Sequence, residues 1–212
     1  MPPSTQLTLF LIASAVLILT PGPAVLYIFA RSVAQGRLAG IVSATGIAIG
    51  DLVHALGAAL GLSAIIASSV LAFSILKYLG AAYLIYLGIR KLYSKPLDPG
   101  AAVVRPELLK NIFRQGVLVG VFNPKPALFF LSFLPQFADP SRGSVQIQLL
   151  TLGIVFVAMA VIGNSTFALL SGTFGTWIKR RKTFLRHERF VTGAVYCGLG
   201  VAAATSLPAR TN

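Results

Sequence analysis

The chain has 212 residues, of which 56% are hydrophobic and 11% are charged, and its mean hydropathy is +0.82. Soluble domains carry about 25% charged residues, so these values exclude an ordinary soluble domain and favour a protein with several membrane helices. Cys197 is the single cysteine in the sequence, which excludes a disulfide framework and a cysteine metal site.

Six apolar stretches predict six membrane helices. Each is long enough to cross a hydrocarbon core of about 30 Å at about 1.5 Å per helical residue. The first stretch has no lysine or arginine before Arg31, so it lacks the basic start of a signal peptide and we expect it to be retained. The predicted spans lie at about 7–29, 39–62, 69–89, 114–135, 147–173 and 190–207.

The net charge of +13 is concentrated on one side of these spans. Most lysines and arginines lie in the connections after the first, third and fifth spans, whereas Arg142 and Arg210 lie on the other side. Basic loops stay in the cytoplasm, so we expect both termini on the outside of the membrane. The charge then indicates anionic lipid head groups as partners rather than nucleic acid.

The connection between the third and fourth spans contains a further helical signal. Arg105-Pro106-Glu107 is followed by apolar residues that alternate with Lys110 and Arg114, and proline is favoured in the first turn of a helix. We expect an amphipathic segment here, lying at the inner membrane surface.

Short matches recur in the same order in both halves of the chain. They predict two three-span repeats, at about 1–95 and 108–212, joined by a cytoplasmic linker at about 93–113 within a single membrane domain. An odd number of spans reverses the second copy, which is typical of secondary transporters. TPGPAVLY at 20–27 parallels NPKPALFF at 123–130, Gly50 and Asp51 parallel Gly163 and Asn164, and GAAY at 80–83 parallels GAVY at 193–196.

Polar residues in three predicted spans share roughly one depth in the bilayer. Asp51 and Lys125 lie near the middle of the second and fourth spans, and Asn164 lies near the middle of the fifth. An Asp or Lys at a helix centre costs about 2.5–3.5 kcal/mol on insertion scales. We therefore expect these side chains to face the protein interior or a water-filled cavity.

Pro-x-Pro sequences interrupt two spans near the same depth. Pro21-Gly22-Pro23 and, with Asn123 before it, Pro124-Lys125-Pro126 remove backbone donors and free carbonyl groups. Unwound backbone is tolerated in a bilayer only inside protein or along a cavity. The fold class we expect is therefore an all-α polytopic membrane protein with six helices in two inverted repeats, in which helices 1 and 4 are broken around a shared site.

His54 lies three residues after Asp51, on the same helix face, where the two can share a proton. Plainer interpretations stay open: His54 as a hydrogen-bonded core residue, the prolines as packing kinks, and Asp51 with Lys125 as a structural ion pair. Gly46-x-x-x-Gly50 and Gly57-x-x-x-Gly61 predict close helix packing. No catalytic motif or phosphate loop is present, and we expect neither enzymatic activity, nor a cofactor, nor a metal.

Four blocks of the sequence resemble the LysE/RhtB family of bacterial amino-acid exporters. The resemblance implies an inner-membrane carrier that exports amino acids or close derivatives, such as homoserine, threonine, lysine or homoserine lactones, driven by the proton-motive force. The blocks are LTPGPAVLYI at 19–28, GIAIGDLVHALGAALGLSA at 46–64, KYLGAAYLIYLGIRKL at 77–92 and FNPKPALFFLSFLPQF at 122–137.

With this resemblance, the buried polar residues predict roles in amino-acid transport. We expect Lys125 to attract the substrate carboxylate, with amides freed near Gly22, and Asp51 to receive the ammonium or exchange a proton. Asn123 and Asn164 offer neutral hydrogen bonds. A passive channel, a membrane-embedded enzyme and a divalent-cation exporter are the rival functions, and a homo-oligomer stays open.

Overall fold

The computed structural model describes residues 4–20, 22–62, 70–93 and 106–180, with seven further residues between 190 and 205. Every regular element in these ranges is a helix, and no strand occurs among them. The described part contains three helices long and apolar enough to cross a membrane, or up to four when one bent pair is counted as a span. These findings support a multi-pass membrane protein.

The first predicted span consists of two helices, α1 (Ser4–Leu19) and α2 (Pro23–Gln35), whose axes differ by 50°. α1 ends where Thr20 turns its hydroxyl back to the carbonyl of Val16, at 2.6 Å. Gly22 is extended, with φ −155° and ψ −173°, and Pro23 opens α2 in the first-turn position that proline favours. Pro21 lies outside the described residues.

The second and third predicted spans are α3 (Arg37–Gly57) and α5 (Val70–Leu92). α2 and α3 are separated by Gly36 alone, whose φ of 86° is a conformation that a side chain disfavours. α3 continues into the π-helical turn η1 (Ala58–Leu62). The connection from η1 to α5 lies outside the described residues.

The fourth predicted span is also interrupted. α6 (Leu109–Val121) is followed by α7 (Pro124–Ser132) and the 3₁₀ helix η2 (Leu134–Phe137). Asn123 caps α7, because its Oδ1 accepts a hydrogen bond from the backbone N–H of Lys125 at 3.2 Å. The segment expected at the membrane surface is not separate from this span, since α6 begins at Leu109 and continues into it.

The fifth predicted span lies in α8 (Val145–Arg180), a helix of 36 residues that follows the short helix η3 (Pro140–Arg142). At about 1.5 Å per residue α8 is about 54 Å long, well beyond a hydrocarbon core of about 30 Å. The sixth predicted span, at 190–207, lies largely outside the described residues. The inverted repeat and the six-span topology therefore stay predictions.

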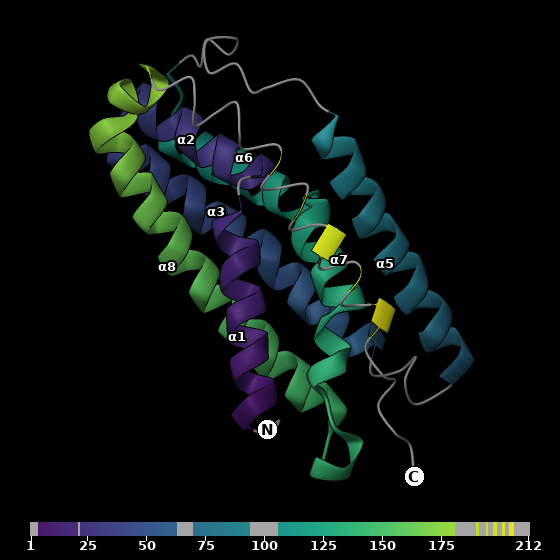
Figure 1. Cartoon of the computed structure of the whole chain (residues 1–212). Coiled ribbons are helices and arrows are strands. Elements are labelled where there is room, and N and C mark those ends of the chain that lie inside the picture. Colours follow the sequence, from purple (N-terminus) through teal and green to yellow (C-terminus); the bar gives the residue numbers. More distant parts are fainter. Residues whose placement is uncertain are drawn as a thin grey trace.

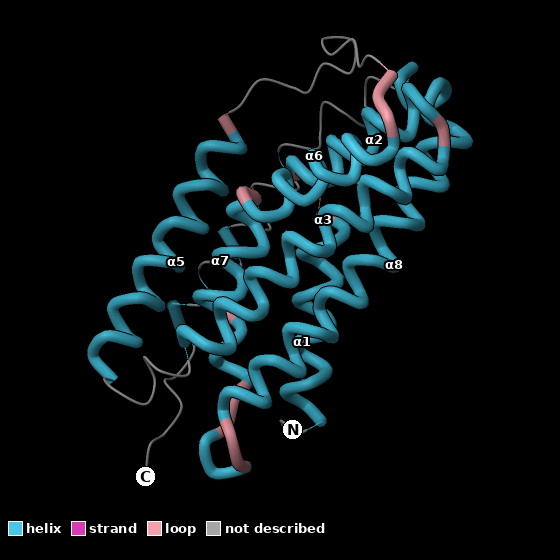
Figure 2. The backbone as a smooth tube through the Cα atoms, turned by 180° about the vertical axis from the view of Figure 1, so that it is seen from behind, coloured by secondary structure: helices cyan, strands magenta, loops and turns pink. Residues whose placement is uncertain are grey.

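α3 is at the centre of the described bundle. It packs against α2, α6 and α8, and Figures 1 and 2 show it between α6 on one side and α8 on the other. α5 lies at the edge of the bundle, where it contacts α7. Asp51, near the middle of α3, is consequently surrounded by protein and 4% exposed.

Glycines bring α3 and α6 close together. A Cβ atom at Gly46 would lie 2.4 Å from the carbonyl oxygen of Phe113, and one at Gly120 would lie 2.5 Å from that of Ile47. The predicted close packing at Gly46 and Gly50 is confirmed, with α6 as the partner. A Cβ at Gly57 or Gly61 meets no described atom within 4 Å, so the structure provides no such contact for that second pair.

A polar network joins α2 to α6 at the end of the bundle where α6 begins (Figure 1). Arg31 is buried, and its Nη1 and Nη2 donate to the Oε1 atoms of Gln35 and Gln115 at 3.1 and 2.7 Å. The hydroxyl of Tyr27 donates to the carbonyl of Ile112 at 3.0 Å and lies 3.2 Å from Oε1 of Gln115. From the sequence, Arg31 belongs to the basic connection after the first predicted span, and no local pattern indicates this network.

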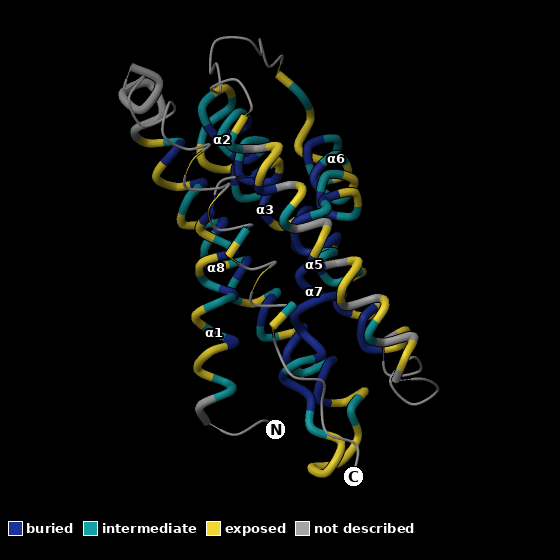
Figure 3. The backbone as a smooth tube through the Cα atoms, turned by 45° about the vertical axis from the view of Figure 1, so that its right-hand side comes forward, coloured by how far each residue is buried: buried dark blue, intermediate teal, exposed yellow. Residues whose placement is uncertain are grey.

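The opposite end of the bundle has an aromatic core instead. The phenylalanine rings come from α1, α7, η2, α8 and the residue between α7 and η2, and their centroids are 4.9–6.2 Å apart where they pair. Figure 3 shows much of α7 buried, whereas the outer faces of α1, α5 and α8 carry exposed residues. Many of these are large and apolar, for example Leu9, Ile12 and Ile162, as expected of faces that contact lipid. The ring cluster comprises Phe10, Phe129, Phe130, Phe133, Phe137 and Phe156.

Candidate functional site

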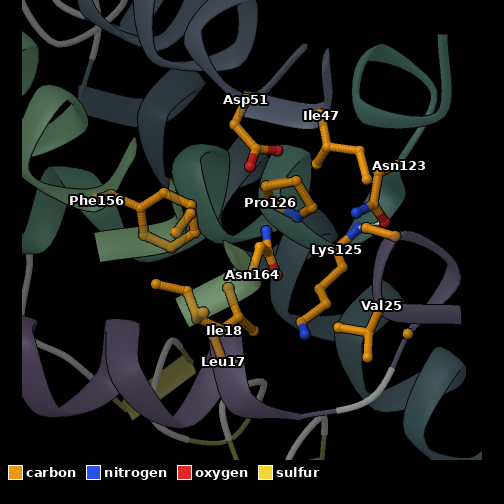
Figure 4. Close-up of a pocket in the computed structure, with 13 residues that line it drawn as sticks. Leu17, Ile18, Val25, Ile47, Asp51, Asn123, Lys125, Pro126, Phe156 and Asn164 are labelled. Atoms are coloured by element: carbon orange, nitrogen blue, oxygen red, sulfur yellow. Dashed lines mark hydrogen bonds between the residues drawn. The ribbon is translucent and has the colours of Figure 1, made fainter. Parts of the chain in front are cut away.

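A pocket lies where the interruption of the first span meets the start of α7 and the middles of α3 and α8 (Figure 4). It has about 370 Å³ of space that no atom fills, including space open to its surroundings. Helix breaks of this kind expose backbone groups that a ligand can use. The lining residues are Leu17, Ile18, Gly22, Ala24, Val25, Ile47, Asp51, Asn123, Lys125, Pro126, Phe156, Ala160 and Asn164.

Four polar side chains predicted from the sequence line this pocket. Asp51 comes from α3, Asn123 and Lys125 from the start of α7, and Asn164 from α8. Their exposed fractions are between 4% and 7%. The pocket thus combines one acidic and one basic group deep inside the described bundle, an arrangement that is expensive to bury without a functional or structural partner.

Lys125 has a backbone partner in the other interrupted span. Its ammonium donates a hydrogen bond to the carbonyl oxygen of Thr20 at 2.5 Å. Thr20 follows the last residue of α1, where helical carbonyl groups lack partners within the helix. The Lys125 side chain therefore ties the start of α7 to the break between α1 and α2.

Asp51 lacks such a partner. Its Oδ1 is buried without a hydrogen-bond partner in the described part of the chain. Asp51 and Lys125 are both described, and no ion pair joins them. In the view of Figure 4 the side chain of Asn164 lies between the Asp51 carboxylate and the Lys125 ammonium. Buried polar atoms are nearly always paired, so an unpaired carboxylate oxygen at this depth is unusual.

His54 is placed differently from Asp51. Its Nε2 lies 3.2 Å from the carbonyl of Gly120 on α6, and His54 does not line the pocket. Within the described residues no hydrogen bond joins His54 to Asp51. The contact with Gly120 supports the plainer interpretation of a hydrogen-bonded histidine, and a part for His54 in proton coupling stays a prediction.

The remaining predicted residues shape the backbone around the pocket. Gly22 lines it directly, whereas Pro23 and Pro124 open α2 and α7 without lining it. Pro126 contributes to the wall, and Pro21 lies outside the described residues. Five of the nine site residues predicted from the sequence therefore line the pocket: Gly22, Asp51, Asn123, Lys125 and Asn164.

The apolar walls were not predicted from the sequence. α1 supplies Leu17 and Ile18, and α8 supplies Phe156 and Ala160. Phe156 and Ala160 precede Asn164 by eight and four residues, which places all three on one face of a helix. That spacing was the available signal, but apolar residues at helical spacing occur in every membrane helix and do not identify a site.

The chemistry that this pocket offers is binding rather than bond making. A carboxylate with a free oxygen can accept an ammonium or a proton, and a buried ammonium can bind a carboxylate. The described ranges contain no group of three or more His, Cys, Asp or Glu side chains that could hold a metal ion. One carboxylate is poor ligation for a hard divalent cation, which prefers several oxygen ligands.

Comparison with known proteins identifies the family. Residues 15–207 match the family model of the LysE type translocators. The chain is 32% identical over 207 residues to an uncharacterized membrane protein of Pseudomonas aeruginosa, PA4757, covering 95% of this chain and 96% of that protein. It is 31% identical over 198 residues to a leucine efflux protein of Salmonella typhimurium, covering 92% and 93% of the two chains.

A membrane protein of Bacillus subtilis, YrhP, is 30% identical over 202 residues, with 91% and 95% of the two chains covered. No solved structure matches the chain. The resemblance seen in the four sequence blocks is therefore confirmed over nearly the whole length, and the prediction of a transporter rather than an enzyme agrees with it. The chain belongs to the family of LysE type translocators.

Proposed function

We propose that this protein is a secondary active transporter that exports amino acids or close derivatives across the bacterial inner membrane by proton antiport. Membership of the translocator family and the efflux proteins among its relatives support an amino-acid exporter. The observation that carries the proposal is the buried pocket in which Asp51 has a free oxygen and Lys125 lies at a helix break.

The two charged groups match the two charges of an amino acid. In this proposal the substrate ammonium binds Asp51, and its carboxylate binds Lys125 with help from amides near Gly22. To bind a carboxylate, Lys125 shares or exchanges its present hydrogen bond to the Thr20 carbonyl. Asn123 and Asn164, both lining the pocket, hydrogen-bond the same groups without adding charge.

Proton coupling follows from the single carboxylate. Asp51 is the one acidic side chain among the lining residues, so a substrate ammonium and a proton compete for it. Outside, a proton replaces the departing substrate on Asp51; inside, Asp51 releases this proton before the next substrate binds, and this exchange couples export to the proton gradient. The broken helices allow the pocket to open alternately, as in other transporters built on interrupted spans.

The proposed orientation rests on the basic connections of the sequence. The three basic loops lie in the cytoplasm beside anionic lipids, and both termini lie outside. A cysteine-labelling experiment tests this arrangement. The double variant Cys197→Ser, Ser144→Cys carries one cysteine, which should react with an impermeant maleimide added outside intact cells. Labelling only after the cells are opened would overturn the orientation.

Efflux from proteoliposomes tests the function itself. Vesicles that contain the purified protein are loaded with labelled leucine, threonine, homoserine or lysine, and export is followed with and without an imposed pH gradient. We expect saturable export that the pH gradient accelerates, and we expect a protonophore to remove this acceleration. If none of these amino acids leaves the vesicles faster than from protein-free vesicles, the proposed function is wrong.

The same vesicles separate the rival functions. A passive channel gives efflux that does not saturate. It also shows no counterflow, which is the acceleration of label exit by unlabelled substrate outside the vesicles. A divalent-cation exporter moves Mn²⁺ or Mg²⁺ instead of amino acids. The shortage of oxygen ligands in the pocket argues against that cation function.

A further inference from the structure

The charged side chains of the pocket come from α3 and α7, which also contribute Ile47 and Pro126. The wall formed by α1 and α8 carries no charge: apart from Asn164 it consists of Leu17, Ile18, Phe156 and Ala160. Figure 4 shows Phe156 across the pocket from Asn123. A ligand whose charged groups lie at Asp51 and Lys125 therefore directs its remaining atoms against an apolar surface.

We propose that the pocket selects amino acids with an apolar side chain, and that Ala160 limits the size of side chain it accepts. The inference rests on the proposed function, because it places the substrate ammonium and carboxylate at Asp51 and Lys125. It goes further by assigning the substrate side chain to the α1–α8 wall.

Charge argues against a cationic side chain in this wall. A lysine substrate would bring a second ammonium, yet Asp51 is the one acid among the lining residues and is already engaged by the first. Burying an ammonium without a partner is costly. A hydroxylated side chain is also disfavoured, because Leu17, Ile18, Phe156 and Ala160 offer it no side-chain hydrogen bond. The cost is smaller than for lysine, because a hydroxyl group carries no charge.

Ala160 is the smallest side chain of that wall. It is 2% exposed and packs in one apolar cluster with Leu17 and Phe156. Phe156 is held in place by Phe129 and Phe130, with ring centroids at 5.3 and 4.9 Å. Ala160 lies one helical turn after this packed ring on the same face of α8 and lines the pocket, so a branched residue at this position would extend into substrate space.

Export of a panel of amino acids by Ala160 variants tests the inference. Proteoliposomes with the full-length protein are loaded with labelled leucine, alanine, phenylalanine, threonine or lysine. Wild type should export leucine fastest and lysine slowest. One methylene in an apolar pocket changes discrimination by about tenfold or more, so Ala160→Val should lower leucine export by at least about tenfold and alanine export by less than about twofold.

Ala158 provides the matched control, because it lies on the same helix with its side chain exposed. Ala158→Val should leave the ratio of leucine to alanine export unchanged. Ala160→Gly, which removes bulk, should raise export of phenylalanine relative to leucine. This variant and the wild-type ranking decide the question if Ala160→Val does not insert into the membrane.

The outcomes distinguish the two proposals. If wild type exports amino acids but prefers lysine or threonine to leucine, the inference is wrong and the proposed function stands. The same holds if Ala160→Val lowers leucine and alanine export equally at equal protein amount, or if Ala160→Gly leaves the phenylalanine-to-leucine ratio unchanged. If wild type exports no amino acid, the proposed function fails and the inference fails with it.

Discussion

The ammonium of Lys125 is hydrogen-bonded to the backbone carbonyl of Thr20, 105 positions earlier in the chain. The contact joins the break of the first span to the start of α7, so the two interrupted segments are linked through one side chain. Asp51 takes no part in it, and its Oδ1 has no hydrogen-bond partner among the described residues. The acidic and basic groups thus line one pocket without an ion pair between them in the described part of the chain.

Replacing Lys125 with methionine should weaken substrate binding. A hydrogen bond to a charged group contributes about 1.5–3 kcal/mol, so we expect the substrate concentration for half-maximal export to rise about tenfold to a hundredfold. Concentration-dependent export from proteoliposomes measures this value. Lys110→Met is the control, since Lys110 is exposed at the start of α6. Unchanged half-saturation in Lys125→Met would show that Lys125 serves only the Thr20 contact.

Asp51→Asn should separate exchange from proton coupling. Asparagine keeps the size and a hydrogen-bonding oxygen but cannot release a proton, so counterflow should persist at a reduced rate while acceleration by a pH gradient is lost. Export with and without an imposed gradient measures the difference. Asp139→Asn is the control, because Asp139 lies in the loop beside Arg142, at 3.3 Å. A full response to the gradient in Asp51→Asn contradicts the coupling role.

The sequence was sufficient to bring several distant residues to one site. Depth in the bilayer and the cost of burying charge placed Asp51, Lys125 and Asn164 at one level, and the structure places all three in one pocket. Pro23 and Pro124 each begin a helix, as proline chemistry favours, while the breaking of both spans at Pro-x-Pro stays a prediction. The shared depth of the polar residues was informative because buried charge has few structural solutions.

Other features could not be predicted from the same sequence. The buried environment of Arg31 depends on Gln115, which lies 84 positions away, and no local pattern distinguishes it from a membrane-flanking arginine. The choice of Gly120 as the partner of His54 likewise depends on how α3 packs against α6. Helix packing in lipid is set by shape and small residues, so spacing within one helix indicates a contact face but not its partner.

Gly50→Ala should destabilise the protein more than Gly57→Ala. A Cβ at Gly50 would lie 2.4 Å from the backbone nitrogen of Val121, so α3 and α6 would have to separate beside the pocket. Overpacking of this kind costs about 1–3 kcal/mol. A Cβ at Gly57, on the same helix, meets no described atom within 4 Å. Thermal unfolding of the purified variants in detergent compares them, and equal midpoints would contradict the close α3–α6 contact.

Gln115→Leu should lower stability, whereas Gln115→Glu should not. The Oε1 of Gln115 accepts a hydrogen bond from the buried guanidinium of Arg31 at 2.7 Å. Leucine removes this acceptor, and loss of a partner for a buried polar group costs about 1–3 kcal/mol, with more for a charged group. Glutamate keeps an acceptor oxygen and adds a charge opposite to that of Arg31. Unfolding midpoints in detergent measure both changes, and an unchanged midpoint in Gln115→Leu would mean that the network does not stabilise the junction of α2 and α6.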